Sequence, residues 1–249
     1  MAILTGKQVV VVGATGGVGA AIVRRVVAED AKTLAVARER TALDRLAREI
    51  AGLDVLPLDA SHEDAPAAVF DAMTPDVLVI SAGARPPAAP LHKLTWSQFA
   101  VNWESDVKMS FGFCKAALDM PLRQGSTVIL ISSGAGLGGS PISGGYAGAK
   151  RTQMFIANYS QKESSRLQLG IRFVTLVPLM IMPDTSLGRF AVEGYAKYMG
   201  VSVTDFLSSL KSPQTPDDVA DAVIELVSSP TARTGSIFSV SHEGIAVVP

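Results

Sequence analysis

Cysteine is nearly absent from the chain, because Cys114 is the only one among 249 residues. An internal disulfide is therefore impossible, and a reducing compartment suits the protein. The first residues lack the apolar core of a secretory signal peptide, and no apolar run approaches the roughly 18 residues of a membrane-spanning helix. These absences predict a cytoplasmic protein with no membrane partner. Cys114 lies in a predicted helix interior, FGFCKAAL, and is expected to be buried packing.

Charge is also sparse, at 18% of residues with a formal net charge of −1, and no block of like charges occurs. This excludes the extended basic surface that binds nucleic acid. His62, His92 and His242 are scattered and lack the spacing of metal ligands, so we expect surface or loop roles for them and no metal. The chain is instead 48% hydrophobic, which indicates a large buried core.

Short apolar runs alternate along the chain with amphipathic stretches. They are rich in Val, Ile and Leu without strict alternation, which is typical of strands buried on both faces of a parallel sheet. The runs cover residues 8–13, 33–37, 54–58, 76–80, 127–132, 171–177 and 236–241. Helical patterns such as 41–50 lie between them, and no linker or repeat interrupts the series. The pattern predicts a doubly wound α/β sheet of seven strands in one domain, residues 1–249.

Three predicted helices are preceded by residues that cap helix N-termini. Thr95 with Gln98 matches a capping box, as does Ser61 with Asp64. Thr215 stands before a third helix and is expected to cap it.

The least regular region is 179–213, where prolines and glycines break the helical pieces. A segment of this kind after the sixth strand is expected to form a lid over a site. Its apolar residues could wall an apolar substrate pocket or could equally be ordinary lid packing; they are Met180, Ile181, Met182, Phe190 and Met199.

A glycine-rich turn, VGATGGVGAAI, follows the first strand and places Gly13, Gly17 and Gly19 before a helix. A dinucleotide site needs such glycines for a tight turn, for close approach of the backbone to a pyrophosphate and for helix packing. The helix then presents free N–H groups and its positive dipole end. The position of the motif favours dinucleotide binding over a glycine-rich turn without a ligand.

The end of the second strand discriminates between cofactors, because an acid there suits the ribose hydroxyl of NAD and an arginine suits the 2′-phosphate of NADP. The strand ends AVARER, with Arg38 at the discriminating place, Glu39 next and Arg40 nearby. A guanidinium binds phosphate through two parallel hydrogen bonds. We therefore expect NADP(H) rather than NAD, unless Arg38 is only a solvated residue at a helix start.

The stretch YAGAK places Tyr146 and Lys150 four residues apart, on one face of a predicted helix. Spacing alone would also suit a solvated surface pair. Together with the glycine turn and the strand series, it resembles the YxxxK motif of the short-chain dehydrogenase/reductase family. Ser133, thirteen residues before Tyr146, matches the family's serine, Asn102 its helix asparagine and Asp59 its adenine-contacting aspartate. Ser132 is adjacent, and only the spacing favours Ser133.

The resemblance implies a Rossmann-like sheet with strand order 3-2-1-4-5-6-7 and hydride transfer between nicotinamide C4 and a carbonyl or alcohol carbon. Tyr146 would be the proton donor, and Lys150 would favour its phenolate and hold the nicotinamide ribose. Ser133 would bond the substrate oxygen, and Asn102 would anchor a proton-relaying water. Cofactor contacts are expected from Gly13, Thr15, Gly16, Gly17, Val18, Gly19, Arg38, Asp59, Ala60, Ser81, Ala82, Gly83, Tyr146, Lys150, Pro178 and Ile181.

Several positions depart from the family's pattern. Val12 replaces a threonine, Ser81 an asparagine and Leu179 a glycine, and Thr185 lies two places beyond the usual threonine position. Residues 242–244 read His-Glu-Gly where the family has Asp-Gly-Gly. These departures leave open a dinucleotide-binding sensor or scaffold that has lost turnover. Epimerase or dehydratase chemistry would need further acid/base groups, which the sequence does not show.

The leading hypothesis is therefore an NADP(H)-dependent oxidoreductase acting on a small, apolar carbonyl or alcohol substrate. The resemblance also implies a homodimer or homotetramer formed through helices spanning about 96–119 and 146–168. Both segments read apolar on more than one face, unless those residues pack on their own sheet.

Overall fold

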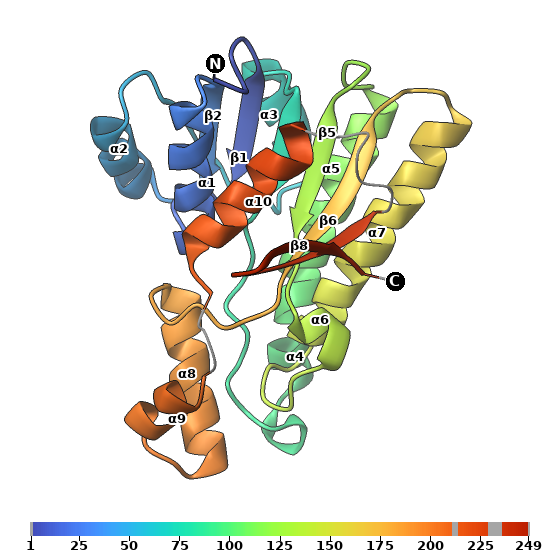
Figure 1. The fold of residues 1–249 in the computed structure, drawn as a ribbon. Helices are drawn as coiled ribbons and strands as arrows, with labels where there is room; N and C mark the ends of the chain where they lie inside the picture. The colour runs from blue at the N-terminus through green and yellow to red at the C-terminus, as the bar shows by residue number, and fades with distance from the viewer. Residues whose placement is uncertain (1, 211–213, 229–235, 249) are drawn as a thin grey trace.

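The computed structural model describes residues 2–210, 214–228 and 236–248, which build one sheet of eight strands in the order β3-β2-β1-β4-β5-β6-β7-β8 (Figure 1). Neighbouring strands from β3 to β7 pair in parallel, whereas β7 and β8 are antiparallel. The strands are β1 Gln8–Val12, β2 Lys32–Ala37, β3 Asp54–Pro57, β4 Val77–Ile80, β5 Thr127–Ile131, β6 Arg172–Pro178, β7 Ile237–Ser241 and β8 Gly244–Val247.

The doubly wound architecture is confirmed, but the expected number of seven strands is wrong. The chain turns at His242 and Glu243 and returns as β8, which pairs with β7 at the sheet edge. Strand β8 has four residues and no buried side chain. Its apolar run, residues 245–248, is too short for periodicity to distinguish a strand from other structure, so the sequence did not reveal it.

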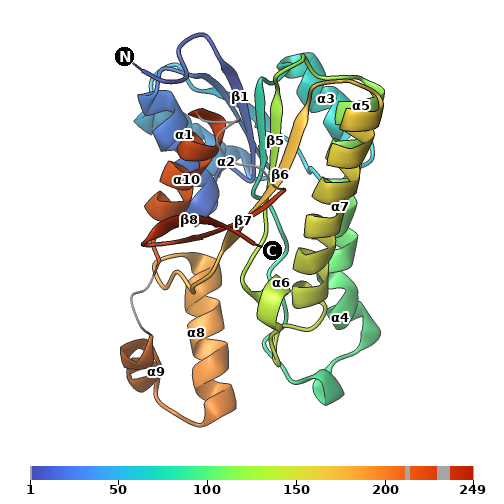
Figure 2. The same ribbon diagram turned by 45° about the vertical axis from the view of Figure 1, so that its right-hand side comes forward.

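Helices cover both faces of the sheet. Helices α1, α2 and α10 contribute to one core cluster, and α3, α5 and α7 contribute to the other (Figure 2). The helices are α1 Gly17–Ala28, α2 Arg40–Glu49, α3 Ala65–Ala72, α4 Trp96–Asn102, α5 Lys108–Asp119, α6 Ala135–Gly138, α7 Tyr146–Arg166, α8 Ser186–Met199, α9 Val203–Ser209 and α10 Pro216–Ser228, with the 3-10 turn η1 Leu91–Lys93 and the π-helical turn η2 Trp103–Val107. In the described part of the chain, no helix is long and apolar enough to cross a membrane.

Successive valines of β1 serve opposite cores. Val9 and Val11 belong to the cluster beneath α1 and α10, whereas Val10 and Val12 belong to the cluster beneath α5 and α7. Side chains alternate between the faces of a strand, so a strand covered on both faces must be apolar at every position. This explains why the strand sequences lack alternation.

Two of the three predicted caps are confirmed. The Thr95 hydroxyl accepts a hydrogen bond from the backbone N–H of Gln98 at 3.3 Å, and the Gln98 side chain accepts from the Thr95 N–H at 2.9 Å. Thr215 accepts from the N–H of Asp218 at 3.2 Å, and the Asp218 carboxylate accepts from the Thr215 N–H at 2.7 Å. Both helices therefore begin with reciprocal caps.

The cap predicted at Ser61 is wrong. Helix α3 begins at Ala65 with Asp64 as its N-cap residue and no side-chain cap, and Pro66 stands in its first turn. Proline suits the first helical turn, where no N–H partner is lost. The Ser61 hydroxyl instead donates to the Asp59 carboxylate at 2.7 Å.

The region predicted as a lid contains α8 and α9, which extend beyond the body of the sheet in Figures 1 and 2; residues 211–213 lie outside the described part. Val192, Ala196 and Phe206 form a small cluster of their own between these helices. Tyr195 joins the region to the loop before α7 through a hydroxyl contact of 2.6 Å with Ser140. The 179–213 region is therefore connected by this contact to the loop between α6 and α7.

Candidate functional site

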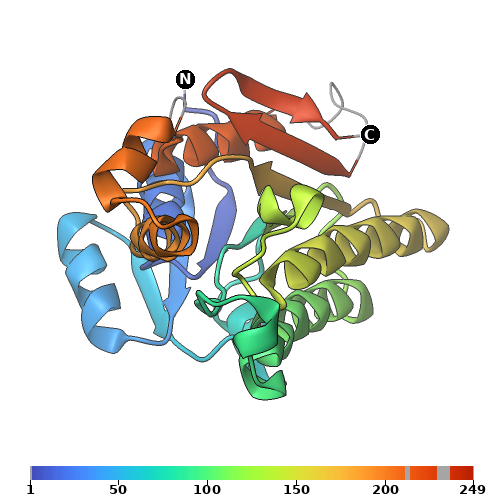
Figure 3. The same cartoon turned by 90° about the horizontal axis from the view of Figure 1, so that it is seen from below.

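The carboxyl ends of the parallel strands meet at one edge of the sheet, where the winding reverses between β1 and β4. Ligands of doubly wound folds bind at such a switch point. The edge carries Gly13 after β1, Ser81 after β4 and Ser133 after β5. Seen from below, α8 and α9 lie to the left of this edge and α4 and α6 to the right (Figure 3).

The glycine turn after β1 is as tight as its sequence predicts. Gly13 has a φ of +87°, and a Cβ there would lie 2.5 Å from the backbone nitrogen of Ala82. A Cβ on Gly19 would lie 2.1 Å from the carbonyl oxygen of Gly13. Helix α1 then begins at Gly17 with neither a side-chain cap nor an acidic residue in its first turn. Its first N–H groups can therefore serve an anion.

Thr185 brings the 179–213 region against this turn. Its hydroxyl donates to the carbonyl of Met182 and accepts from the N–H of Gly188, both at 2.9 Å, so that it caps α8. Its methyl group is so close that a Cβ on Gly17 would lie 2.5 Å from it. The structure places Ile181 against the α8–α9 cluster. Thr185 thus contacts the glycine turn, a contact that the sequence did not predict.

The other residues expected to contact the cofactor differ in whether their side chain or only their backbone is accessible to a ligand. Thr15 and Val18 are half-buried in the glycine turn, whereas the Ala60 side chain belongs to the core. Pro178 ends β6, and its carbonyl accepts a hydrogen bond of 2.7 Å from the Gly134 N–H. At Ala60 and Pro178 the backbone, rather than the side chain, is what a ligand could meet.

Arg38 and Asp59 lie exposed where β2 and β3 end. Hydrogen bonds from the Ser61 hydroxyl and N–H, together with the charge of Arg38, hold the pKa of Asp59 below its usual value. The neighbouring Arg40 is paired with Asp44 at 2.8 Å along α2. Arg40 therefore has an ion-pair partner in α2, whereas Arg38 has no such pair with α2.

Tyr146 and Lys150 do not form a solvated surface pair, so that alternative is wrong. Tyr146 is half-buried at the start of α7, and Lys150 is only 5% exposed. The Lys150 Nζ lies 5.5 Å from the centroid of the Tyr146 ring and donates to the carbonyl of Ile131 at 3.2 Å. A buried lysine beside a phenol requires a compensating charge, because an isolated buried ammonium is costly.

That charge comes from Asp106, whose Oδ2 lies 3.3 Å from Lys150 Nζ. Burial acts to lower the pKa of Lys150, but the charges of Asp106 and Tyr146 outweigh it, so the pKa is raised above its ordinary value. Lys150 is accordingly an ammonium at neutral pH. The sequence did not single out Asp106.

Asn102 and Asp106 together hold the residue that follows Gly83. The Asn102 amide donates to the carbonyl of Ala84 at 2.7 Å, and Asp106 Oδ1 accepts from the Ala84 N–H at 2.8 Å. Asn102 also donates to Asp106 Oδ1 at 3.3 Å. Asn102 therefore lies at the predicted site, but the side chain that touches the lysine is that of Asp106.

The π-helical turn η2 explains why Asp106 was missed. Residues 96–119 were predicted as one regular helix, whereas Trp103–Val107 forms a wider turn between α4 and α5. Such turns shift the helix face and are frequent at functional sites. The available signal was weak, because Asp106 follows Asn102 by one turn in a stretch that also contains Glu104 and Lys108.

The two adjacent serines have different surroundings. Ser132 is buried, and its hydroxyl donates to the carbonyl of Lys150 at 2.8 Å, which joins β5 to α7. Ser133 is half-buried, and its oxygen accepts from the Ala135 N–H at 3.2 Å. The Ser133 hydroxyl proton is therefore left to donate to a ligand, which favours Ser133 over Ser132.

A cavity of about 280 Å³ lies beside the start of α7, lined by Leu91, Phe99, Ser140, Pro141 and Gly144. The apolar residues suggested from the lid are placed differently. Ile181 belongs to the α8–α9 cluster, Met182 packs on the main core, and Met199 is exposed. Lid packing therefore describes Ile181, whereas Met182 belongs to the main core and Met199 lies at the surface.

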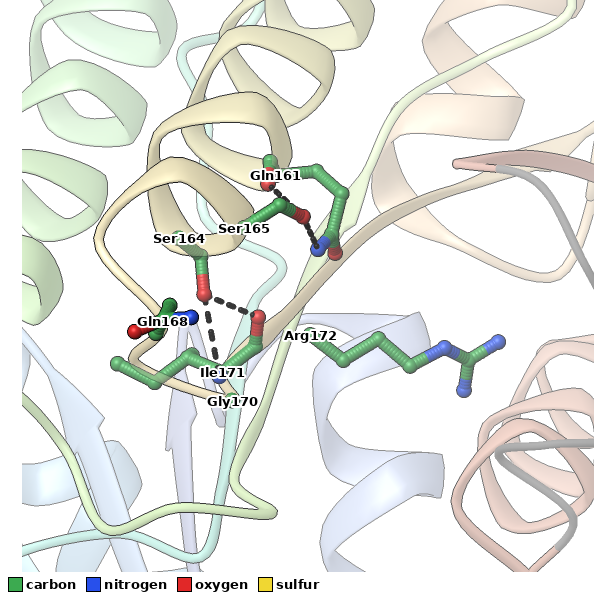
Figure 4. Close-up of a pocket in the computed structure, with 7 residues that line it drawn as sticks. All are labelled: Gln161, Ser164, Ser165, Gln168, Gly170, Ile171 and Arg172. Atoms are coloured by element: carbon green, nitrogen blue, oxygen red, sulfur yellow. Dashed lines mark hydrogen bonds between the residues drawn. The ribbon is translucent and has the colours of Figure 1, made fainter.

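A second pocket, of about 390 Å³, lies at the other end of α7 (Figure 4). Its polar groups join α7 to β6: the Ser164 hydroxyl donates to the Ile171 carbonyl at 2.7 Å and accepts from its N–H at 3.1 Å. The Arg172 guanidinium extends away from this cluster in Figure 4 and donates to the carbonyl of Leu226 at 2.6 Å. At ~1.5 Å per residue, this pocket begins roughly 22 Å along the helix from Tyr146, too far to share its chemistry.

No group of three or more His, Cys, Asp or Glu residues in the described ranges could hold a metal ion. Cys114 is buried as predicted, and burial raises the pKa of its thiol to about 12. It is therefore inert packing at neutral pH.

A family model described as short chain dehydrogenase matches residues 7–192. Serine 3-dehydrogenase of Agrobacterium fabrum is 26% identical over 233 residues, which are 89% of this chain and 88% of that protein. L-fucose dehydrogenase of Oryctolagus cuniculus is 28% identical over 178 residues, 70% of this chain but only 62% of that protein. A crystal structure of 3-ketoacyl-(acyl-carrier-protein) reductase from Brucella melitensis, complexed with NADH, has a TM-score of 0.76 at 19% identity. That likeness covers 94% of this chain and 96% of the other, and it confirms the Rossmann-like fold.

Proposed function

Because the chain belongs to the short chain dehydrogenase family, we propose that it is an NADP(H)-dependent oxidoreductase acting on a carbonyl or alcohol carbon of a small substrate. The observation that carries the proposal is the buried Lys150 ammonium beside the Tyr146 ring, at the carboxyl edge of the sheet. A surface ion pair or a purely structural lysine would not need a phenol at this distance.

The residues at this edge fit a dinucleotide. Gly13 and Gly19 leave no room for a Cβ, and the N-terminus of α1 has neither a cap nor an acid to oppose a pyrophosphate. Lys150 has donors beyond the one that Ile131 accepts, which suits ribose hydroxyls. When bound, the nicotinamide supplies or takes up the hydride.

The chain's own residues manage the proton and the oxygen. In reduction, Tyr146 gives its hydroxyl proton to the carbonyl oxygen, and Ser133 donates a hydrogen bond to the same atom. The Lys150 ammonium stabilises the phenolate that remains. Asn102 keeps its Oδ1 buried without a donor from the described residues, and we propose that this oxygen accepts from the proton-relaying water.

The preference for NADP rests on Arg38, which is exposed at the end of β2 close to Asp59. A guanidinium here suits a 2′-phosphate. NAD is the alternative, and NADH is the cofactor of the Brucella reductase complex. Equal affinity of the protein for NADPH and NADH would reject the NADP assignment.

The cavity before the start of α7, which Tyr146 itself does not line, favours a small substrate with an apolar part, since Leu91, Phe99 and Pro141 line it. Two relatives are named for serine and for L-fucose, which are polar hydroxy compounds. We therefore propose a substrate whose reacting oxygen meets Tyr146 while its remainder fills this cavity.

We also propose that the protein is a homodimer or homotetramer. Four aromatic side chains from α4, α5 and α7 are exposed in the chain by itself; they are Trp96, Phe111, Phe155 and Tyr159. The alternative, that the apolar residues of these helices pack on their own sheet, holds for Phe113, Leu118 and Ile156 but not for these four exposed rings. An exposed apolar face of this kind is typical of an interface. Light scattering should give a mass at least twice 26.0 kDa.

The test is oxidation of NADPH by the wild-type protein across a panel of ketones and aldehydes, with NADH in parallel. We expect turnover of at least one carbonyl, faster with NADPH. Tight binding of a dinucleotide with no turnover of any carbonyl or alcohol would instead indicate a sensor or scaffold, and the assigned activity would be rejected.

A further inference from the structure

Asp106 is a buried carboxylate with no exposed surface, placed by η2 between three parts of the site. Its Oδ1 accepts hydrogen bonds from the Ala84 N–H and from Asn102, and its Oδ2 lies 3.3 Å from Lys150 Nζ. The contact with Lys150 is an ion pair without hydrogen-bond geometry. Oδ2 therefore keeps acceptor capacity, and Nζ keeps hydrogens for other partners.

The surroundings leave the carboxylate little freedom. A Cβ on Gly83 would lie 2.6 Å from Asp106 Oδ2, so this glycine is required by the approach of the carboxylate. The backbone of Asp106 is also fixed, since its carbonyl accepts from the Ser110 hydroxyl at 2.8 Å. Ser110 in turn accepts from Gln153 of α7 at 2.8 Å. Asp106 thus connects η2, the loop after β4 and α7.

We propose that Asp106 is a positioning residue for the proposed reaction. Its carboxylate holds Lys150 as an ammonium beside Tyr146 and links the lysine to the loop that contains Gly83 and Ala84. The inference rests on the proposed function, because Lys150 acts there on Tyr146 and on the cofactor ribose. Asp106 itself acts through the lysine and need not touch the substrate.

The physical reason is the balance of charges around Nζ. The titratable groups that act on it are Asp106 from η2 and Tyr146 from its own helix, and β5 presents the carbonyl of Ile131. Without the carboxylate, burial would dominate and the pKa of Lys150 would fall. The ammonium would then be lost at a lower pH, and with it the activity.

Asp106→Asn tests this role, because the amide keeps the shape and the acceptor for the Ala84 N–H. It removes the charge and places an NH2 donor where Oδ2 faced Lys150 Nζ. We expect kcat to fall by on the order of 10-fold or more at neutral pH, and the alkaline loss of activity to move to lower pH. The matched control is Asp119→Asn, whose carboxylate pairs with Lys115 on the exposed face of α5. Its kcat and pH profile should equal those of the wild type.

A second measurement, of thermal stability against pH, tests the ion pair of Asp106 with Lys150 without an activity assay. In Lys150→Met the Asp106 carboxylate is buried without a cation and must take up a proton to stay folded. That variant should therefore lose thermal stability as pH rises from about 5 to about 8, because its folded state then binds more protons than its unfolded chain. The wild type and the double variant Asp106→Asn/Lys150→Met should not show this slope.

These results separate the inference from the proposed function. If no protein turns over a carbonyl but the stability slope appears only in Lys150→Met, the reaction is wrong and the ion pair stands. A wild-type kcat and pH profile in Asp106→Asn would overturn the positioning role. A flat stability profile in Lys150→Met would overturn it as well, even if Asp106→Asn did not fold.

Discussion

The two ends of α7 use buried polar groups in opposite ways. At its C-terminal end, Ser164 makes two reciprocal hydrogen bonds with Ile171, and only Arg172 Nη2 of the pocket's described side chains is buried without a partner. At its N-terminal end, Lys150 faces a carboxylate, and the buried Asn102 Oδ1 and Asp106 Oδ2 have no hydrogen-bond donor among the described residues. An unpaired buried group is therefore not enough to mark a site; the N-terminal end differs because its two unpaired oxygens lie beside a buried ammonium and a phenol.

Apart from the loss of the Tyr146 hydroxyl, the largest effect should come from Lys150→Met. The variant removes the cation that stabilises the phenolate and a donor to the cofactor ribose, so we expect kcat/KM to fall by on the order of 10³-fold. Steady-state kinetics would measure it, with binding of NADPH followed separately. Full activity in this variant would mean that the N-terminal end of α7 is no more functional than the other end.

The adjacent serines should give the next largest contrast. Ser133→Ala removes a hydrogen bond to the reacting oxygen, so kcat should fall by on the order of 10²-fold with little change in melting temperature. Ser132→Ala removes the bond to the Lys150 carbonyl and should cost about 1–3 kcal/mol of unfolding free energy. Reversed results would exchange the two assignments.

Cofactor choice should respond to Arg38→Asp. Loss of the guanidinium removes the partner of the 2′-phosphate, so the ratio of kcat/KM for NADPH over NADH should fall by roughly 10- to 100-fold. Arg40→Asp, which disturbs a pair within α2, is the matched control and should change the ratio little. The same shift in both variants would indicate a general effect of charge.

The smallest effect on activity should come from the C-terminal end of α7. Ser164→Ala leaves the buried N–H of Ile171 without its partner and should lower the free energy of unfolding by about 1–3 kcal/mol. Its kcat at a temperature where the protein is folded should remain that of the wild type. A large loss of kcat would show that this end also contributes to the reaction.

The sequence predicted most of the fold because burial dictates it. Valines such as Val9 and Val10 face opposite cores, and that requirement is visible in composition. Strand β8 was missed because its apolar run is only about four residues long, too short for periodicity to mark a strand. The Ser61 cap was misplaced because Pro66 moves the helix start. Both errors concern the local geometry of short segments, which a hydrophobic pattern does not determine.

For the site, the sequence predicted the residues whose spacing is regular. Tyr146 and Lys150 share a helix face, and Gly13 and Gly19 are spaced as a tight turn requires. Asp106 could not be found in this way, because the π-helical turn that aims it at Lys150 breaks the regular period. A group whose placement depends on an irregular turn becomes visible only in three dimensions.

The most direct test of the account compares two tyrosines of α7 by the same single change. Tyr146→Phe removes the proposed proton donor, and Tyr159→Phe changes an exposed ring further along the helix. Reduction of a carbonyl by NADPH should slow by on the order of 10² to 10⁴-fold in the first variant and not in the second. Wild-type turnover by Tyr146→Phe would contradict the catalytic role of this phenol.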